Sequence, residues 1–290
     1  MIWPLPPRSR KSIARIEVTG VIAAATRKRV LEALKVIEAR RFPALLLRID
    51  SPGGTVGDSQ EIYTALGRLR DKLKIVASFG NISASGGVYI GMGAEHIMAN
   101  PGTITGSIGV ILRGNNLERL LDRVGVSFKV IKSGPYKDIL AFDRELTTAE
   151  QTILQELIDV SYRQFVKTVA EARHLSEDTV RGFADGRIFT GEQAVQLGVV
   201  DRLGSEEEAR YWAAELVGLD PDKTECITFG EKKAGLRRLL PGGDNAMAGG
   251  NSSPGGGALV GLSLPALNAT LEWLEFERST SGLPLWLYRP

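Results

Sequence analysis

Residues 81–93, NISASGGVYIGMG, place two serines directly before the glycine pair Gly86–Gly87. A serine at a strand-to-helix turn can act as a nucleophile, and neighbouring glycines leave backbone amides open to a developing oxyanion. Ser85 is the better candidate, because Ser83 lies further from the glycines. The local sequence fits a second interpretation equally well, since serine is also a common helix cap.

A serine nucleophile needs a base to take its proton, and the two histidines are poorly placed for this role. His96 follows Ser85 by 11 residues (96 − 85 = 11), so a helix between them would separate the two by more than about 10 Å. His174 lies in a polar turn, ARHLSE. Lysine is the alternative base if burial favours its neutral form. Lys137 in VIKSGPYKDILAF has apolar and aromatic neighbours, although taken alone it is more typical of a surface lysine. Lys132, at the end of a predicted strand, is expected to face solvent.

A second glycine pair, Gly53–Gly54, lies in the motif DSPGG, which follows the apolar run ALLLRID. Glycine amides at such a turn can point at a ligand oxygen, and the next helix adds a partial positive charge. The motif could therefore form half of an oxyanion hole. A tight turn between a strand and a helix explains it as well.

The elements that carry these residues alternate between short apolar runs and helical patterns. Strands are predicted at 13–22, 44–50, 74–79, 103–112 and 127–132, and helices at 27–40, 58–70 and 116–124. From Thr147 a long helix begins with the capping box Thr147-x-x-Glu150, and its apolar stripe runs through residues 153–169. This alternation predicts an α/β fold with a helical excursion.

Composition narrows the function classes. A net charge of +2 and a pI near 8.6 are too mild to indicate a nucleic-acid partner. Cys226 is the only cysteine, which excludes an intramolecular disulfide and a metal site built from cysteines. We predict that the protein uses neither a metal nor a cofactor.

The two ends of the chain differ from its middle. In residues 1–11 basic residues follow apolar ones, the reverse of a secretory signal, and no stretch approaches the roughly 18 apolar residues of a membrane span. We therefore expect no signal peptide and no membrane anchor, and a location in the cytoplasm or on a membrane surface. Residues 233–290 are predicted to form a glycine-rich linker and an apolar tail. The tail fits a disordered end, or a segment that docks on a partner subunit, a membrane or its own active site.

Together, these segments resemble the signal peptide peptidase A (protease IV) family of serine–lysine peptidases, in its short single-domain form. The resemblance rests on five motifs in the family's order, spanning about residues 12–232: DSPGG (50–54), ASGG with VYI (84–90), PGTITGSIGV (101–110), IKSGPYKDI (131–139) and FTGEQAVQLGVVDRLG (189–204). Residues 12–232 would then form one peptidase domain.

The resemblance assigns roles to individual residues. Ser85 matches the nucleophile and Lys137 the general base. The amides of Gly54 and Gly86 match the oxyanion hole, and Ser107 matches a serine that orients the lysine.

The resemblance also implies a crotonase-like fold of the ClpP/crotonase superfamily, with ββα repeats. Family members assemble into rings, so it implies a homo-oligomer, an octameric ring in which neighbouring subunits share each dyad. Its substrates would be extended, hydrophobic peptides, including released signal peptides, bound by strand addition. Many members carry an N-terminal membrane anchor, whereas we expect at most peripheral membrane contact here.

Two other functions share parts of this pattern. A crotonase-type acyl-CoA hydratase or lyase would have the glycine-based oxyanion hole without needing Ser85 and Lys137. A non-catalytic, membrane-associated ring scaffold would need none of the side chains of Ser85, Ser107 and Lys137. The presence of Ser85, Ser107 and Lys137 together favours the peptidase.

Overall fold

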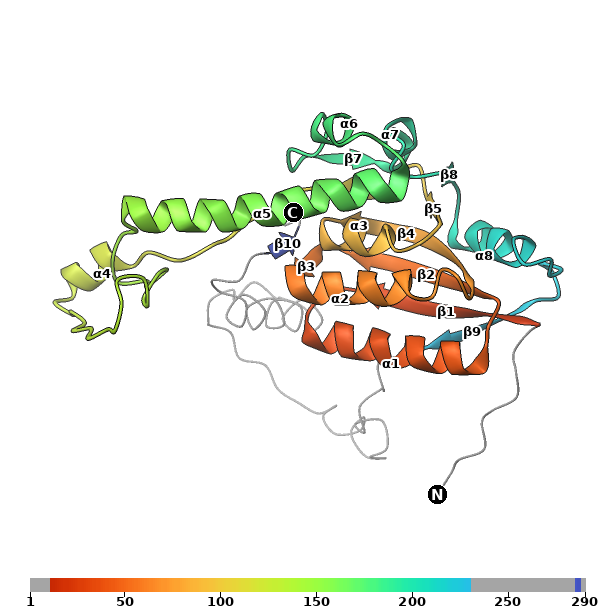
Figure 1. The fold of residues 1–290 in the computed structure, drawn as a ribbon, viewed down its shortest axis with the longest axis horizontal. Helices are drawn as coiled ribbons and strands as arrows, with labels where there is room; N and C mark the ends of the chain where they lie inside the picture. The colour runs from red at the N-terminus through yellow and green to blue at the C-terminus, as the bar shows by residue number, and fades with distance from the viewer. Residues whose placement is uncertain (1–10, 231–284, 288–290) are drawn as a thin grey trace, which may run out of the picture. The chain divides into compact units, whose positions relative to one another are not determined.

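A mostly parallel β-sheet forms the centre of the fold (Figure 1). The structure, a computed structural model, describes residues 11–230 and 285–287. The strands of this sheet are β1 (Ser12–Thr19), β2 (Ala44–Ser51), β4 (Lys74–Ala84), β5 (His96–Ala99), β6 (Ile104–Gly106), β7 (Ile188–Thr190), β8 (Arg202–Leu203) and β9 (Glu225–Phe229). They lie in the order β7-β6-β4-β2-β1-β9, with β5 and β8 branching from β4. Two further strands, β3 (Gly53–Thr55) and β10 (Leu285–Leu287), form a separate antiparallel pair.

Helices cover both faces of the sheet. They are α1 (Ala24–Arg40), α2 (Val56–Gly67), α3 (Gly86–Gly91), α4 (Glu118–Arg123), α5 (Thr148–Arg173), α6 (Glu177–Arg181), α7 (Gly191–Gln196) and α8 (Glu206–Glu215). Helices α1, α2 and α3 pack in one apolar cluster, and α8 packs in another through Trp212.

Strand β2 shows why the sheet needs both layers. Its side chains alternate between the two apolar clusters, with Leu45, Leu47 and Ile49 in one and Ala44 and Leu46 in the other. A strand that is buried on both faces reads as a continuous apolar run rather than as an alternating one. The prediction from ALLLRID is confirmed.

Residues 107–147, between β6 and α5, leave the sheet and are called the excursion from here on. Helix α4 lies within it, near the N-terminal end of α5 (Figure 1). Two sequence predictions are wrong here. The strand expected at 103–112 is limited to β6, and the one expected at 127–132 is absent, with Ile131 fully exposed. An extended segment becomes a stable strand only when a neighbour accepts its backbone hydrogen bonds, and 127–132 has no paired strand among the described residues.

Helix α5 is buried along only part of its length. The predicted capping box is confirmed: Thr147 accepts from the amide of Glu150, whose side chain accepts from the amide of Thr147. Phe165, Val166 and Val169 in the C-terminal half are fully buried, whereas Ile153 and Leu157 are 38% and 40% exposed. One chain therefore covers the predicted apolar stripe only in its second half.

Strand β10 belongs to the same compact unit as residues 11–230. Of the two interpretations of the tail, Leu285–Leu287 fits docking, because these residues pair with β3. Of the predicted linker and apolar tail at 233–290, residues 233–284 and 288–290 lie outside the described residues, as does the N-terminal segment 1–11 except for Lys11. Within the described ranges, no helix has both the length and the apolar character needed to cross a bilayer.

Candidate active site

A bulge in β4 sets the position at which this strand ends. The register between β2 and β4 shifts, so that Ile49 pairs with Phe79 but Ser51 pairs with Ser83. The carboxylate of Asp50 fills the space: it accepts hydrogen bonds from the Asn81 amide nitrogen at 3.3 Å, the Asn81 side chain at 2.9 Å and the Ile82 amide at 3.2 Å. The acid at the end of the predicted strand thus fixes the start of the NISASGG segment.

Ser85 occupies the turn between β4 and α3 in a strained conformation. Its φ is 53° and its ψ is −114°, a region that costs a non-glycine residue about 1–3 kcal/mol. Its amide donates to the Gly106 carbonyl at 2.8 Å, and its carbonyl accepts from the Tyr89 amide at 3.0 Å. The side chain is 1% exposed, and within the described ranges its Oγ has no hydrogen-bond partner. A strained serine with an unpaired hydroxyl is typical of a functional position.

Ser83 differs from Ser85 in its backbone setting. It lies inside β4 and is fully buried. Its Oγ is also unpaired among the described residues and faces Gly87, where an added Cβ would lie 3.3 Å away. Of the two serines, only Ser85 sits at the strand-to-helix turn, the position that the sequence analysis considered for a nucleophile.

Gly54 lies in β3 where no side chain fits. A Cβ added there would lie 1.8 Å from the Ile22 carbonyl oxygen. The carbonyl of Gly53 and the amide of Thr55 both bond to Ile22, at 2.8 and 2.9 Å. Because backbone groups alternate along a strand, the Gly54 amide faces the opposite edge. Strand β3 contacts α3, whose first residue is Gly86, so the structure brings the two predicted oxyanion donors to one region.

Ser107 lies beside the candidate nucleophile. Ala84 pairs with Gly106 in parallel strands, so the next residues of the two strands, Ser85 and Ser107, are neighbours. Ser107 has a φ of 51° and is 8% exposed, and its amide donates to the Arg187 carbonyl at 2.7 Å. The structure therefore brings Ser107 to the site.

Lys137 is not brought to Ser85 within one chain. It lies in an exposed turn of the excursion, and its amide donates to Gly134 at 3.3 Å. Because the Oγ of Ser85 has no partner among residues 11–230 and 285–287, neither Lys137 nor a histidine bonds to it there. His96 packs against Trp212 at 4.6 Å between ring centroids. His174 caps the end of α5 and is exposed.

A network of charges that the sequence reasoning missed holds the residue next to Lys137. Arg144 donates to Asp138 at 2.9 Å and to Glu150 at 2.6 Å, and Lys132 donates to Asp138 at 2.6 Å. Lys132 is therefore ion-paired rather than simply exposed to solvent. The hydrogen bond from Arg144 and those from Thr147 lower the pKa of Glu150 to about 2. The network ties the Lys137 turn to the first turn of α5.

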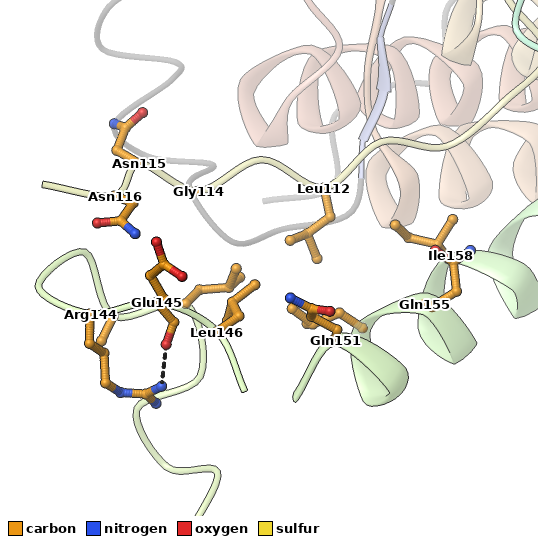
Figure 2. Close-up of a pocket in the computed structure, with 13 residues that line it drawn as sticks. Leu112, Gly114, Asn115, Asn116, Arg144, Glu145, Leu146, Gln151, Gln155 and Ile158 are labelled. Carbon is orange, nitrogen blue, oxygen red and sulfur yellow. Dashed lines mark hydrogen bonds between the residues drawn. The ribbon is translucent and has the colours of Figure 1, made fainter. Parts of the chain in front are cut away.

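A cavity of about 550 Å³ lies between this network and the poorly covered half of α5 (Figure 2). Its lining includes Leu112, Leu140, Leu154 and Ile158, with Arg144 at one side. The cavity combines an apolar wall with charged groups and is distant in sequence from the Ser85 turn.

Comparisons with known proteins identify the family. The model of peptidase family S49 matches residues 68–220, which include the Ser85 turn, the excursion and α5. The chain belongs to peptidase family S49. It is a serine peptidase, as the sequence predicted. A Synechocystis sp. protein with the name "Putative protease" is 66% identical over 289 residues and is matched along the full length of both chains.

Other similar proteins are more distant. A protein of Enterococcus faecium with the name "Putative signal peptide peptidase SppA" is 35% identical over 214 residues, covering 69% of this chain and 62% of its own. A solved mutant of a membrane-bound stomatin-specific protease has a TM-score of 0.53 at 16% identity, covering 77% of this chain and 99% of its own. This last likeness concerns the fold alone. The predicted α/β fold is confirmed.

Replacing Asp50 should destabilise the turn that carries Ser85. Asp50→Ala leaves three donors of the bulge without their acceptor, which we expect to lower the free energy of unfolding by about 1–3 kcal/mol. Urea unfolding followed by circular dichroism measures this loss. Asp71→Ala removes an exposed aspartate and serves as the control. Equal unfolding midpoints for both variants would contradict the role given to Asp50.

The Arg144–Glu150 contact should make stability depend on pH in the acid range. The pKa of Glu150 is about 2 in the folded chain, below its ordinary value of 4.5, so its contribution is complete above 4.5 and is lost as the pH falls towards 2. Glu150→Gln should lower the Tm at pH 7 and flatten its dependence between pH 4.5 and 2. Glu156→Gln, an exposed site on the same helix, should follow the wild type. Parallel curves for wild type and Glu150→Gln would refute this.

Proposed function

We propose that the chain is an endopeptidase in which Ser85 is the nucleophile and Lys137 the general base. The observation that carries the proposal is the Ser85 turn, with its positive φ, its unpaired hydroxyl and two glycine amides in the same region. The substrates are extended, hydrophobic peptides, released signal peptides among them. The name of the Enterococcus relative supports this substrate class.

The chemistry follows from these positions. Lys137 takes the proton of Ser85 as Oγ attacks the peptide carbonyl, and then passes it to the leaving amine. Water hydrolyses the acyl-enzyme in a second step. The amides of Gly54 and Gly86 stabilise the oxyanion, where losing one donor typically costs about 2.7–4 kcal/mol. Ser107 lies beside Ser85 and orients the lysine.

The base comes from a neighbouring copy of the chain. Lys137 is exposed in the excursion, and Ser85 lacks a partner among the described residues of its own chain. A closed ring, octameric as the family resemblance implies, would bring the excursion of one copy to the Ser85 turn of the next. The ring would contact a membrane only peripherally and otherwise stay in the cytoplasm.

Exposed apolar side chains on the excursion support this assembly. More than half of the surface is exposed at Leu120, Val124, Phe128 and Val130, in addition to Ile131. Their clustering in one segment of the chain supports an interface, because large exposed apolar patches are rare on soluble monomers. Ile153 and Leu157 on α5 are exposed as well, and the cavity beside the N-terminal half of α5 has apolar side chains in its lining.

Labelling with a serine-directed phosphonate tests the dyad. Ser85→Ala should abolish labelling because the nucleophile is absent, and Lys137→Ala should reduce it by at least about 100-fold because the base is absent. Intact-mass spectrometry counts the labelled chains. Ser83→Ala and Lys129→Ala are the matched controls and should label normally. Full labelling of Ser85→Ala, or its loss in Ser83→Ala, would refute the assignment.

Mixing two inactive variants tests whether the dyad spans subunits. Each shared site needs Ser85 from one copy and Lys137 from its neighbour, so a random 1:1 mixture of Ser85→Ala and Lys137→Ala should recover about a quarter of wild-type peptidase activity. Mixing Ser85→Ala with the double variant should recover none. If native mass spectrometry shows subunit exchange without recovery, the shared site is wrong.

A further inference from the structure

The C-terminal strand β10 lies between two backbone segments at the candidate active site. On one side it pairs antiparallel with β3, so that Leu285 faces Thr55 and Trp286 faces Gly54. On the other side, the amide of Leu285 donates to the Ile111 carbonyl at 3.0 Å, and the amide of Ile111 donates to the Leu285 carbonyl at 3.1 Å. The side chain of Leu285 is buried, with 9% of its surface exposed.

The alternation of backbone groups gives the direction of the next residue. Both backbone groups of Leu285 point towards Ile111, so those of Trp286 point towards β3. The amide of Gly54 points away from Ile22 and towards this same edge. The Trp286 carbonyl is therefore on the side of the proposed oxyanion donor.

Strand β10 also lies close to the nucleophile in the fold. It contacts α3, whose first residue directly follows Ser85, and it lies beside β3 (Figure 1). Extended peptides commonly bind by adding a strand to an open edge, with backbone hydrogen bonds on each side. Without β10, the edge of β3 and the backbone of Ile111 would present such a site.

We propose that β10 occupies the position of a peptide substrate, so that the chain's own C-terminal segment is a ligand of the site and competes with substrates. This rests on the function proposed above. The register then assigns the substrate: the residue in the place of Trp286 presents its carbonyl to the amide of Gly54, and the preceding residue inserts a leucine-like side chain into a buried subsite.

A purely structural strand would behave differently from a competitor. If β10 only braces β3, removing it disorders the oxyanion donor, and activity falls. If β10 competes, removing it frees the site, and the apparent KM falls by the fraction of time that the segment was bound. The two roles therefore predict opposite changes.

The experiment breaks the bridge to Ile111 in the full-length protein. Leu285→Pro removes the donor amide, and Leu285→Asp places a charge in the buried subsite; each should lower the KM for a short apolar peptide about tenfold, with kcat unchanged. Leu285→Met keeps the amide and the side-chain volume, so it should match the wild type. A rise in KM or a loss of kcat in both disrupting variants would overturn the proposal.

A peptide added in trans separates this proposal from a folding defect. The synthetic peptide LPLWLYRP, residues 283–290, should inhibit Leu285→Pro competitively and return its apparent KM to the wild-type value. The same peptide with Asp in place of its second leucine should not inhibit. If the intact peptide fails to inhibit while Leu285→Pro stays folded, β10 does not bind where substrates do.

A binding measurement separates this inference from the catalytic assignment. Fluorescence anisotropy of the labelled peptide should show binding to the double variant Ser85→Ala/Leu285→Pro, and much weaker binding to Ser85→Ala, whose own tail fills the site. That difference requires no catalysis, so it would persist even if phosphonate labelling showed that Ser85 is not the nucleophile. Equal binding to the two proteins would refute the competition.

Discussion

The carboxylate of Asp50 is the contact on which the site depends. It holds the extra residues of β4 through three hydrogen bonds, and this bulge determines which residue reaches the end of the strand. The bulge adds two residues to β4 between the pairs Ile49–Phe79 and Ser51–Ser83, so without it the residues that follow would pair with β2 two positions further along. Ser85 arrives at the turn with a positive φ because Asp50 on one side and the carbonyl of Gly106 on the other fix the backbone before and at it.

The candidate site residues lie in two different settings, one buried and one exposed. The Ser85 turn, the two glycine amides and Ser107 lie at the ends of buried strands, where packing can hold them in place. Lys137 lies in a segment whose position depends on Arg144, Asp138 and the start of α5. Helix α5 links the two parts, because the hydroxyl of Thr168 donates to that of Tyr89 in α3. A lysine presented in this way is suited to meeting a serine of another copy.

The sequence predicted those elements that leave a pattern among neighbouring residues. The apolar run of β2 and the capping box at Thr147 could be found from sequence, because burial on both faces leaves a continuous apolar run and a capping box involves residues only three positions apart. The missing strand at 127–132 could not, since a strand requires a partner that only the fold supplies. Asp138 gave a signal through its position next to Lys137, but Arg144 gave none. The strain at Ser85 and the pairing of β10 arise from contacts between distant segments, which the five motifs do not contain.

The edge of β3 explains why a peptidase site would carry its own strand. An edge that can accept any extended peptide is also an edge that can pair with the wrong chain, and proteins generally cover such edges. A covalently attached strand covers it at a high effective concentration, yet it can be displaced without unfolding the sheet, since β3 and β10 form a pair separate from the main sheet. Backbone pairing favours any extended peptide equally, and it is the buried position of Leu285 that adds selectivity. Protection of the edge and choice of substrate thus depend on the same few backbone hydrogen bonds.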